Sequence, residues 1–164
     1  EADVFGTRPG YNPHEYRWGD GTAKIIDFYM FADGADYPTA ISTGQKIVLE
    51  VVVKFLETLR RPIFGITIKT KEGVTVYGTN SEKLDIDGFR SKGRAGESVV
   101  LQVSYICRLA PGDYFISLGV ATSQGEEIIP HDRRYDSIHF QVRPATTFFG
   151  LVNAEMEINI EETI

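Results

Sequence analysis

Residues 47–55 read IVLEVVVKF, and every second side chain in this stretch is apolar. The alternating apolar positions are Ile47, Leu49, Val51, Val53 and Phe55. Because successive side chains of a β-strand point to opposite faces, these five would face a core, while Glu50 and Lys54 would face solvent. The stretch therefore predicts a strand with one buried face, and the same two-residue period recurs along most of the chain.

The composition favours β-structure throughout. The 164 residues include 16 Ile and 13 Val against 8 Leu and 10 Ala, and 12% of them are aromatic. β-Branched and aromatic side chains suit a pleated, half-buried surface, whereas Leu and Ala suit helices. Further segments with a two-residue period lie at 23–31, 63–69, 74–79, 98–107, 114–121, 136–143 and 156–160. We therefore predict an all-β domain, an antiparallel β-sandwich of about eight strands separated by turns.

The domain boundaries follow from where this period begins. Residues 1–21 contain turn signals such as Pro9-Gly10 and Asn12-Pro13 but no periodic apolar pattern. They are predicted to form an N-terminal lead-in or a linker. Residues 22–164 are assigned to the sandwich.

The charge balance excludes some partners. The chain carries a net charge of −6 at pH 7, so it lacks the basic surface that nucleic acids or anionic membranes require. No apolar run approaches the roughly 20 residues of a membrane helix, so no direct membrane insertion is expected. Cys107 is the single cysteine, which excludes an intrachain disulfide and favours a reducing compartment. Because the first residue is Glu1 rather than Met, we expect a segment of a longer polypeptide.

The motifs of catalytic and cofactor sites are missing or weak. Residues 88–95 have the glycine spacing of a phosphate-binding P-loop but lack its Lys-Ser/Thr ending. His131 lies near Asp132 and Asp136, yet residues 130–135 are better interpreted as a charged, solvated loop than as a metal site. No cofactor or metal is therefore expected. A pair of carboxylates acting on a glycan stays open as the weaker, enzymatic alternative, because the chain has 23 acidic residues.

Outward-facing side chains provide the candidate binding site. If the apolar positions of each strand face the core, their neighbours face outward. The outward positions are Thr67, Lys69, Tyr77, Phe115, Ser117, His139 and Gln141. Aromatic rings stack on the apolar faces of sugars, and amide, imidazole and ammonium groups bond hydroxyls, so this set would form a carbohydrate platform. The alternative, that another strand or a partner subunit covers this face, is equally open.

Several strings along the chain resemble those of a known family. They are RWGDG (17–21) with AKI (23–25), RPIFGITI (61–68), VYGTNS (76–81), LAPGDY (109–114) and DSIHFQV (136–142). Their order and spacing over residues 17–143 resemble the C-terminal domain of the Wzt-type ATP-binding subunits of ABC transporters that export O-antigen polysaccharide. The matching strings consist mainly of turn and core residues, so the candidate binding residues rest on strand phase alone.

The resemblance implies a fold, a function and partners. It implies an immunoglobulin-like β-sandwich and a non-catalytic module that binds O-antigen polysaccharide before export. It also implies that the module works in the cytoplasm, at the inner face of the inner membrane, with the ATPase and membrane subunits of the transporter. A homodimer is a further implication, with residues 156–160 as a strand exchanged between protomers. A protein-interaction sandwich without glycan binding and, less favoured, a glycan-active enzyme remain the alternatives.

Overall fold

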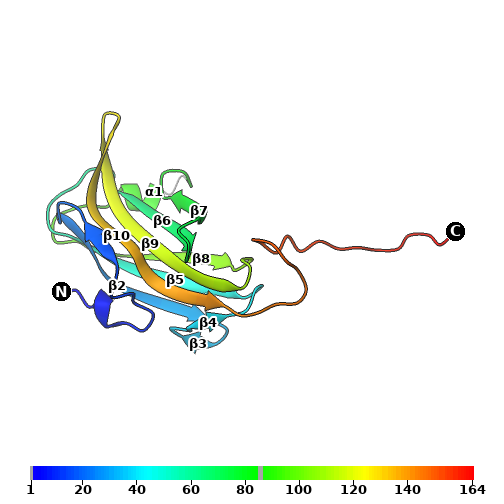
Figure 1. Cartoon of the computed structure of the whole chain (residues 1–164). Coiled ribbons are helices and arrows are strands. Elements are labelled where there is room, and N and C mark those ends of the chain that lie inside the picture. The colour runs from blue at the N-terminus through cyan, green and yellow to red at the C-terminus, as the bar shows by residue number, and fades with distance from the viewer. Residues whose placement is uncertain (1, 85–86) are drawn as a thin grey trace.

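Two β-sheets face each other in the computed structural model, which describes residues 2–84 and 87–164 (Figure 1). Sheet A contains, in spatial order, β1 (Tyr16–Trp18), β10 (Glu127–Val142), β9 (Gly112–Gln124), β6 (Ile63–Thr70) and β7 (Thr75–Asn80), and β4 (Ala40–Ile41) also pairs with β10. Sheet B contains β3 (Ala35–Asp36), β2 (Ala23–Ala32), β5 (Lys46–Phe55) and β8 (Ser98–Ile106). Every one of these strand pairs is antiparallel except β10 with β4, so the predicted all-β antiparallel sandwich is confirmed.

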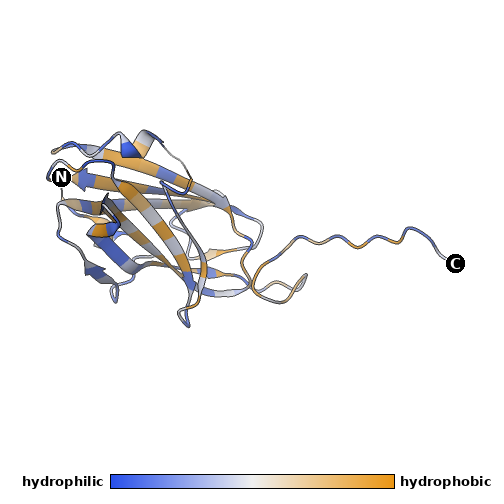
Figure 2. Ribbon diagram, turned by 90° about the horizontal axis from the view of Figure 1, so that it is seen from above, coloured by the Kyte–Doolittle hydropathy of each residue, from blue (hydrophilic) through white to orange (hydrophobic). Residues whose placement is uncertain are grey.

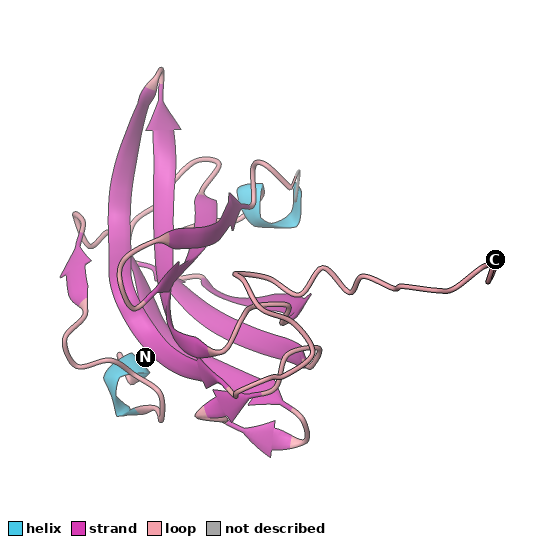
Figure 3. Ribbon diagram, turned by 45° about the vertical axis from the view of Figure 1, so that its right-hand side comes forward, coloured by secondary structure: helices cyan, strands magenta, loops and turns pink. Residues whose placement is uncertain are grey.

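Helical structure in the described residues is confined to two short elements, the 3-10 turn η1 (Phe5–Thr7) and the helix α1 (Asp87–Arg90) (Figure 3). Neither is long and apolar enough to cross a membrane. The described residues form ten strands rather than about eight: β1, β3 and β4, each two or three residues long, were not predicted, and the strand predicted at 156–160 is absent. Such short strands leave no recognisable period in the sequence.

The core lies between the sheets and follows the alternation expected for residues 47–55. The five odd-numbered side chains of this strand are completely buried. They face a layer from sheet A formed by Ile116, Leu118, Ile138 and Phe140, and the alternation along the strands is visible in Figure 2. Burying one such side chain stabilises the fold by about 1.5–3 kcal/mol, so this double layer is the main source of stability.

Residues 130–135 do not form the solvated loop that the sequence predicted, because they continue β10. Asp132 and Arg134 within this stretch are buried. Asp132 accepts a hydrogen bond from the backbone N–H of Ile25 at 2.7 Å and pairs with Arg17 at 2.8 Å. A buried charge is tolerated when it is paired and hydrogen-bonded. The partners here come from distant parts of the sequence, so the local pattern alone gave the wrong prediction.

The N-terminal lead-in packs onto the sandwich. Phe5 is completely buried, and the Arg134 Cζ atom lies 4.0 Å from the centroid of its ring. Arg134 also donates to Glu15 at 2.5 Å and to Asp3 at 2.9 Å. The strand β1 then pairs with β10 at the edge of sheet A. These contacts attach the segment from Asp3 to Trp18 to the sandwich.

The C-terminal segment leaves the sandwich. Val152 forms a β-bridge with Leu109, and Glu155 pairs with Arg108 at 3.1 Å. Beyond this point the chain runs away from both sheets as an extended segment (Figures 1 and 2). Residues 156–160 are not in a strand, and their alternating apolar side chains are exposed. The strand predicted there does not form within a single protomer.

Candidate functional site

The outer face of sheet A, which points away from sheet B, is arranged in rows of cross-strand neighbours. The strand register places in one row, from β7 to β1, Asn80, Gly65, Gly119, Arg133 and Trp18. The row beside it contains Gly78, Thr67 and Ser117. Directly paired residues point to the same face of a sheet, so each row is a continuous line of positions across the outer face.

Three glycines, Gly65, Gly78 and Gly119, leave the middle of these rows without side chains. A glycine inside a strand weakens it and often marks a close approach by another molecule. None of the three has a positive φ, and a Cβ built on Gly65 or Gly119 would have nearest contacts of 3.9 and 3.7 Å, which are ordinary. The backbone therefore does not require glycine at these positions. Two of them, Gly65 and Gly119, line a groove of about 340 Å³, here called the outer groove. Its lining also includes Ile63, Thr67, Asn80, Ser117, Arg133 and Tyr135.

Three aromatic side chains, Tyr16, Trp18 and Tyr135, form a rim beside the groove. Tyr16 and Trp18 are exposed on β1, where they lie opposite Tyr135 and Arg133 of β10. The ring centroid of Tyr135 lies 6.2 Å from that of Tyr16 and 6.2 Å from that of Trp18. Exposed aromatic faces beside a groove suit the apolar faces of sugar rings. We call these three residues the aromatic rim.

Two cations lie against the aromatic rim. The Arg133 Cζ atom is 5.4 Å from the centroid of the Trp18 ring, and Arg133 Nη1 donates to the Tyr135 hydroxyl at 3.2 Å. Lys69 Nζ lies 5.5 Å from the centroid of the Tyr135 ring. Cation–π contacts at exposed sites stabilise by about 0.5–1 kcal/mol each, so they favour one arrangement of rings and cations. N–H donors thus stand next to ring faces, which is the combination that a hydroxyl-rich ligand needs.

A second cluster lies on the same face, nearer to β4. The rings of Phe115 and His139, both in the predicted set, stack with centroids 5.0 Å apart. His139 Nε2 donates to Asp113 Oδ1 at 2.8 Å, and Gln141 Nε2 donates to the same oxygen at 2.9 Å. These hydrogen bonds, from Gln141 first and then from His139, lower the pKa of Asp113. Because the polar groups of the cluster bond one another, its outward surface is mainly the stacked pair of rings.

The structure places six of the seven predicted residues on the outer face of sheet A. Thr67 and Ser117 line the outer groove, and Lys69 lies over the aromatic rim. Ser117 was expected to be exposed, but it is buried and its Oγ accepts a hydrogen bond from the N–H of Asp136 at 2.8 Å. The register of β10 is irregular between Arg134 and Ile138, so the strand carries extra residues opposite Ser117. Ligand binding by these six residues stays a prediction.

Tyr77 lies on the opposite face of sheet A, so its predicted place in the platform is wrong. It is the cross-strand neighbour of the buried Ile68. The register of β7 shifts at Val76, which reverses the alternation expected from the sequence. Tyr77 instead lines an apolar cavity of about 410 Å³, the edge cavity, between β7 and β8. Tyr105 also lines it; its hydroxyl is buried without a hydrogen-bond partner in the described structure, and burial raises its pKa.

Sequence reasoning missed the aromatic rim and Arg133. Two of these residues lay in the segment assigned to the lead-in and two in the segment predicted to be a loop, so their strand phase was not considered. A usable signal was nonetheless present. The triplets Phe64-Gly65-Ile66, Tyr77-Gly78-Thr79 and Leu118-Gly119-Val120 each place a glycine inside a predicted strand. Such glycines indicate a surface that another molecule can approach closely.

The arrangement of polar side chains gives little support to the enzymatic alternative. His131 Nε2 lies 2.8 Å from Thr122 Oγ1, and His131 Nδ1 lies 3.0 Å from Asp20, which is the order of a nucleophile, base and acid. However, Thr122 and His131 are buried, and none of the three residues lines the outer groove. Within residues 2–84 and 87–164 no group of three His, Cys, Asp or Glu residues could hold a metal ion. Cys107 is completely buried, which raises the pKa of its thiol and leaves it a packing role.

These features define a β-sandwich domain with an open, aromatic-rimmed groove on one sheet. The chain belongs to the Wzt C-terminal domain family, whose model matches residues 14–154. It is also similar to a crystal structure of the C-terminal domain of wzt, with a TM-score of 0.86 and 35% sequence identity over 98% of this chain and 96% of that chain. A comparison with curated proteins found no match. The predicted family is therefore confirmed.

Proposed function

We propose that the outer groove binds O-antigen polysaccharide and that the domain performs no chemical step. Membership in the Wzt family associates the chain with O-antigen transport. The observation that carries the binding proposal is the coincidence of three strand-interior glycines with an exposed aromatic rim on one sheet face. The glycines let a sugar ring approach the backbone, the rim covers its apolar face, and Arg133 and Lys69 donate to its hydroxyls.

The groove is shallow enough to predict a weak, reversible complex. Its floor is backbone, and its polar groups already contact one another, so each sugar gains few new bonds. We expect micromolar or weaker affinity, about −8 kcal/mol or less favourable. Weak binding suits a domain that must release a polymer after recognising it.

A leucine at position 119 tests the groove directly. Gly119 has an ordinary backbone conformation, and the nearest atom to an added Cβ would be Arg133 Cγ at 3.7 Å, so Gly119→Leu should fold and fill the groove. Calorimetric titration with the polysaccharide of the host should show at least a tenfold loss of affinity, about 1.4 kcal/mol. The control Gln102→Leu adds the same side chain to the exposed face of sheet B and should bind like wild type. Unchanged binding in Gly119→Leu would rule out the outer groove.

The same titration separates the alternatives. An interaction module would show no heat with polysaccharide, and the exposed aromatic rim would instead support association with another protein. A glycan-active enzyme would shorten the polymer, which gel filtration of the recovered polysaccharide would reveal. Recovery of full-length polymer after saturable binding is the result that the proposal requires.

The proposal includes a place of action and partners. The domain would work in the cytoplasm, at the inner face of the inner membrane, beside the ATPase and membrane subunits of the transporter. Co-purification of tagged domain with those subunits from solubilised membranes tests this part. Its failure would leave the polysaccharide titration as an independent measurement.

The exposed C-terminal segment is proposed to mediate a homodimer. Residues 156–160 alternate apolar and polar side chains, and the apolar ones have no cover within the protomer. The neighbouring edge cavity, which Val152 also lines, offers apolar surface of the kind such a strand would bury in a partner. Truncation after Glu155 keeps the ion pair with Arg108 and removes only the extended part. We expect sedimentation to show a dimer for the full chain and a monomer after truncation; an unchanged dimer would contradict the exchange.

A further inference from the structure

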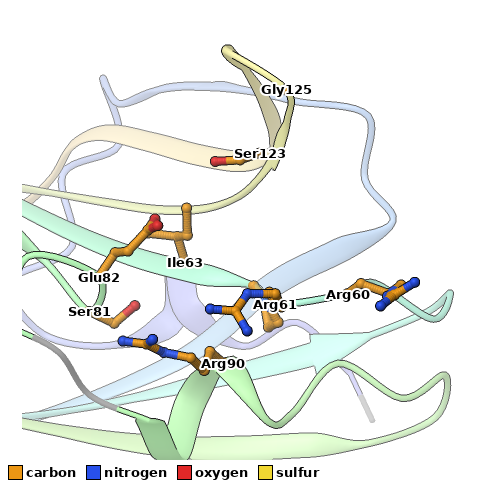
Figure 4. A pocket seen from close by; sticks show the side chains of 9 residues that line it. Arg60, Arg61, Ile63, Ser81, Glu82, Arg90, Ser123 and Gly125 are labelled. Atoms are coloured by element: carbon orange, nitrogen blue, oxygen red, sulfur yellow. The ribbon is translucent and has the colours of Figure 1, made fainter.

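A cluster of arginines lines a cavity next to the outer groove. The cavity has a volume of about 390 Å³, and its polar lining includes Arg60, Arg61, Arg90, Ser81, Glu82 and Ser123 (Figure 4). We call it the arginine pocket. Ile63 and Glu82 belong to the walls of both the pocket and the outer groove, so the two cavities adjoin. A chain with a net charge of −6 thus concentrates cations beside its candidate binding site.

Arg60 and Arg61 differ from Arg90 in having no partner for their side chains among the described residues. Arg60 and Arg61 make no ion pair or hydrogen bond through their side chains with the residues that the structure describes. Arg90 lies 3.3 Å from the exposed Asp87. Figure 4 shows Arg61 pointing in the direction of Ser81 and Arg90, while Arg60 points away. Ser81 Oγ accepts the N–H of the neighbouring strand residue 64 at 3.0 Å, so its own hydroxyl proton remains available to a ligand.

The backbone holds Arg61 in an unfavourable conformation. Its φ of 53° lies in the left-handed region, which side chains with a Cβ rarely adopt. The chain is closely packed two residues earlier: the N–H of Leu59 donates to the Gly93 carbonyl at 2.7 Å, and a Cβ on Gly93 would lie 2.2 Å from the Leu59 oxygen. Strained residues persist where the surrounding structure fixes them, and they cluster at ligand sites. The strained backbone of Arg61, whose side chain is exposed, therefore marks this turn as a candidate ligand site.

We propose that the arginine pocket binds an oxyanion, a phosphate, sulfate or carboxylate, carried by the polymer in the outer groove. This inference rests on the proposed function and names its substrate class, an acidic polysaccharide. Guanidinium groups bind oxyanions through paired N–H donors in a fixed fork. Arg61 supplies such a fork, and the Ser81 hydroxyl, in the same pocket lining, donates a third hydrogen bond. The shared wall at Ile63 lets one polymer chain occupy the groove and the pocket together.

The first experiment tests the pocket with inorganic phosphate. Titration at low chloride is followed through the arginine Nε–Hε signals in NMR spectra. We expect saturable shifts of Arg61 and Arg90, at least tenfold weaker binding in Arg61→Gln, and wild-type behaviour in Arg94→Gln. Arg94 is an exposed arginine outside the pocket, so this control removes the same charge. Linear shifts of all arginines alike, or an equal loss in both variants, would overturn the site. Arg61→Gly relieves the strained φ, so this variant should stay folded while it loses phosphate binding, and thermal unfolding of the same sample checks the fold.

The second experiment tests the source of the oxyanion. Affinity is measured for the host polysaccharide before and after chemical removal of its acidic groups. We expect Arg61→Gln to weaken binding of the acidic polymer at least tenfold and to leave binding of the stripped polymer unchanged. If Arg61→Gln binds both like wild type while Gly119→Leu binds neither, the proposed function stands and the acidic substrate class is wrong. If Gly119→Leu binds normally, the outer groove is wrong, and the phosphate titration still decides the arginine pocket.

Discussion

The arginines that attach the lead-in to the sandwich and those of the arginine pocket differ in how their charge is compensated. Arg17 and Arg134 share Asp3, and Arg17 also forms two hydrogen bonds with Asp132. Arg61, by contrast, has no such partner in the described structure. The paired arginines fasten a segment to the sandwich, whereas the unpaired one leaves its donors open to a ligand. The partners of an arginine, rather than its presence, thus separate a structural from a binding role.

The same contrast appears between two adjacent residues of β10. Arg134 points into the sandwich and donates to the Ile25 carbonyl at 3.0 Å, while Arg133 points outward and lies over Trp18. Successive side chains of a strand face opposite sides, so one residue in the pair serves the fold and the other serves the surface. Variants at these two positions therefore give the sharpest test of the comparison.

Removing Arg134 is expected to have the largest effect on stability. Its side chain is almost completely buried, and its loss would leave the buried carboxylate of Glu15 without its cation, while Asp3 would keep Arg17. Breaking a buried pair by deleting one partner typically costs about 3–5 kcal/mol, because the remaining charge stays buried. Urea unfolding of Arg134→Ala should show a loss of that size.

Arg133→Ala is the matched control for that experiment. Arg133 is only half-buried, so its removal should cost less than about 1 kcal/mol in unfolding free energy while weakening polysaccharide binding. Equal destabilisation by the two alanine variants would contradict the division of β10 into a structural and a binding face.

The sequence predicted the sandwich well and the site in part. Burial of one strand face leaves a two-residue period of apolar residues in the sequence, and this period correctly predicted the strand at residues 47–55. The loop predicted for residues 130–135 was wrong because the charges there are neutralised by groups such as Glu15, more than a hundred positions away. The alternation of side chains along the strands placed Phe115 and His139 on the outward face, but it did not predict the aromatic rim. The strand that carries Trp18 is three residues long and is defined by its pairing with β10, a tertiary contact without a local pattern.

Trp18→Ala should weaken polysaccharide binding by about tenfold, an effect smaller than that of Arg134→Ala on stability. The ring stands at the groove with Arg133 over its face, and an aromatic contact of this kind is worth about 0.5–1.5 kcal/mol beyond its buried area. Phe31→Ala is the control, because Phe31 on sheet B is similarly exposed, at 37% against 39% for Trp18. Calorimetry should show wild-type affinity for the control. A similar loss in both variants would argue against a specific role for the rim.

Arg61→Gly should stabilise the domain slightly while it removes oxyanion binding. Glycine adopts the φ of 53° without strain, and this gain exceeds the entropy cost of glycine by about 0.5–1 kcal/mol. Gly93→Ala, in the loop that packs against the same segment, should do the opposite, because its Cβ would overlap the Leu59 carbonyl. Thermal unfolding compares the two variants. A lower unfolding temperature for Arg61→Gly would show that the arginine is held by contacts in the fold and would weaken the case for a ligand.

The smallest effect on stability is expected from removing the charge of Asp27. This residue of β2 forms an ion pair with Arg8 of the lead-in, and the pair is more exposed than those of Arg134. Its carboxylate accepts two hydrogen bonds from Arg8, at 2.7 and 2.8 Å, and these bonds lower the pKa of Asp27 against the opposing effect of burial. A carboxyl whose folded pKa lies below the unfolded value of about 3.9 contributes fully above that pH and loses its contribution as the pH falls through the folded pKa. Urea midpoints measured from about pH 6 down to pH 3 should therefore fall less steeply in Asp27→Asn than in wild type. The exposed turn variant Glu126→Gln should keep the wild-type slope, and a slope for Asp27→Asn equal to wild type would show that the lead-in does not depend on this pair.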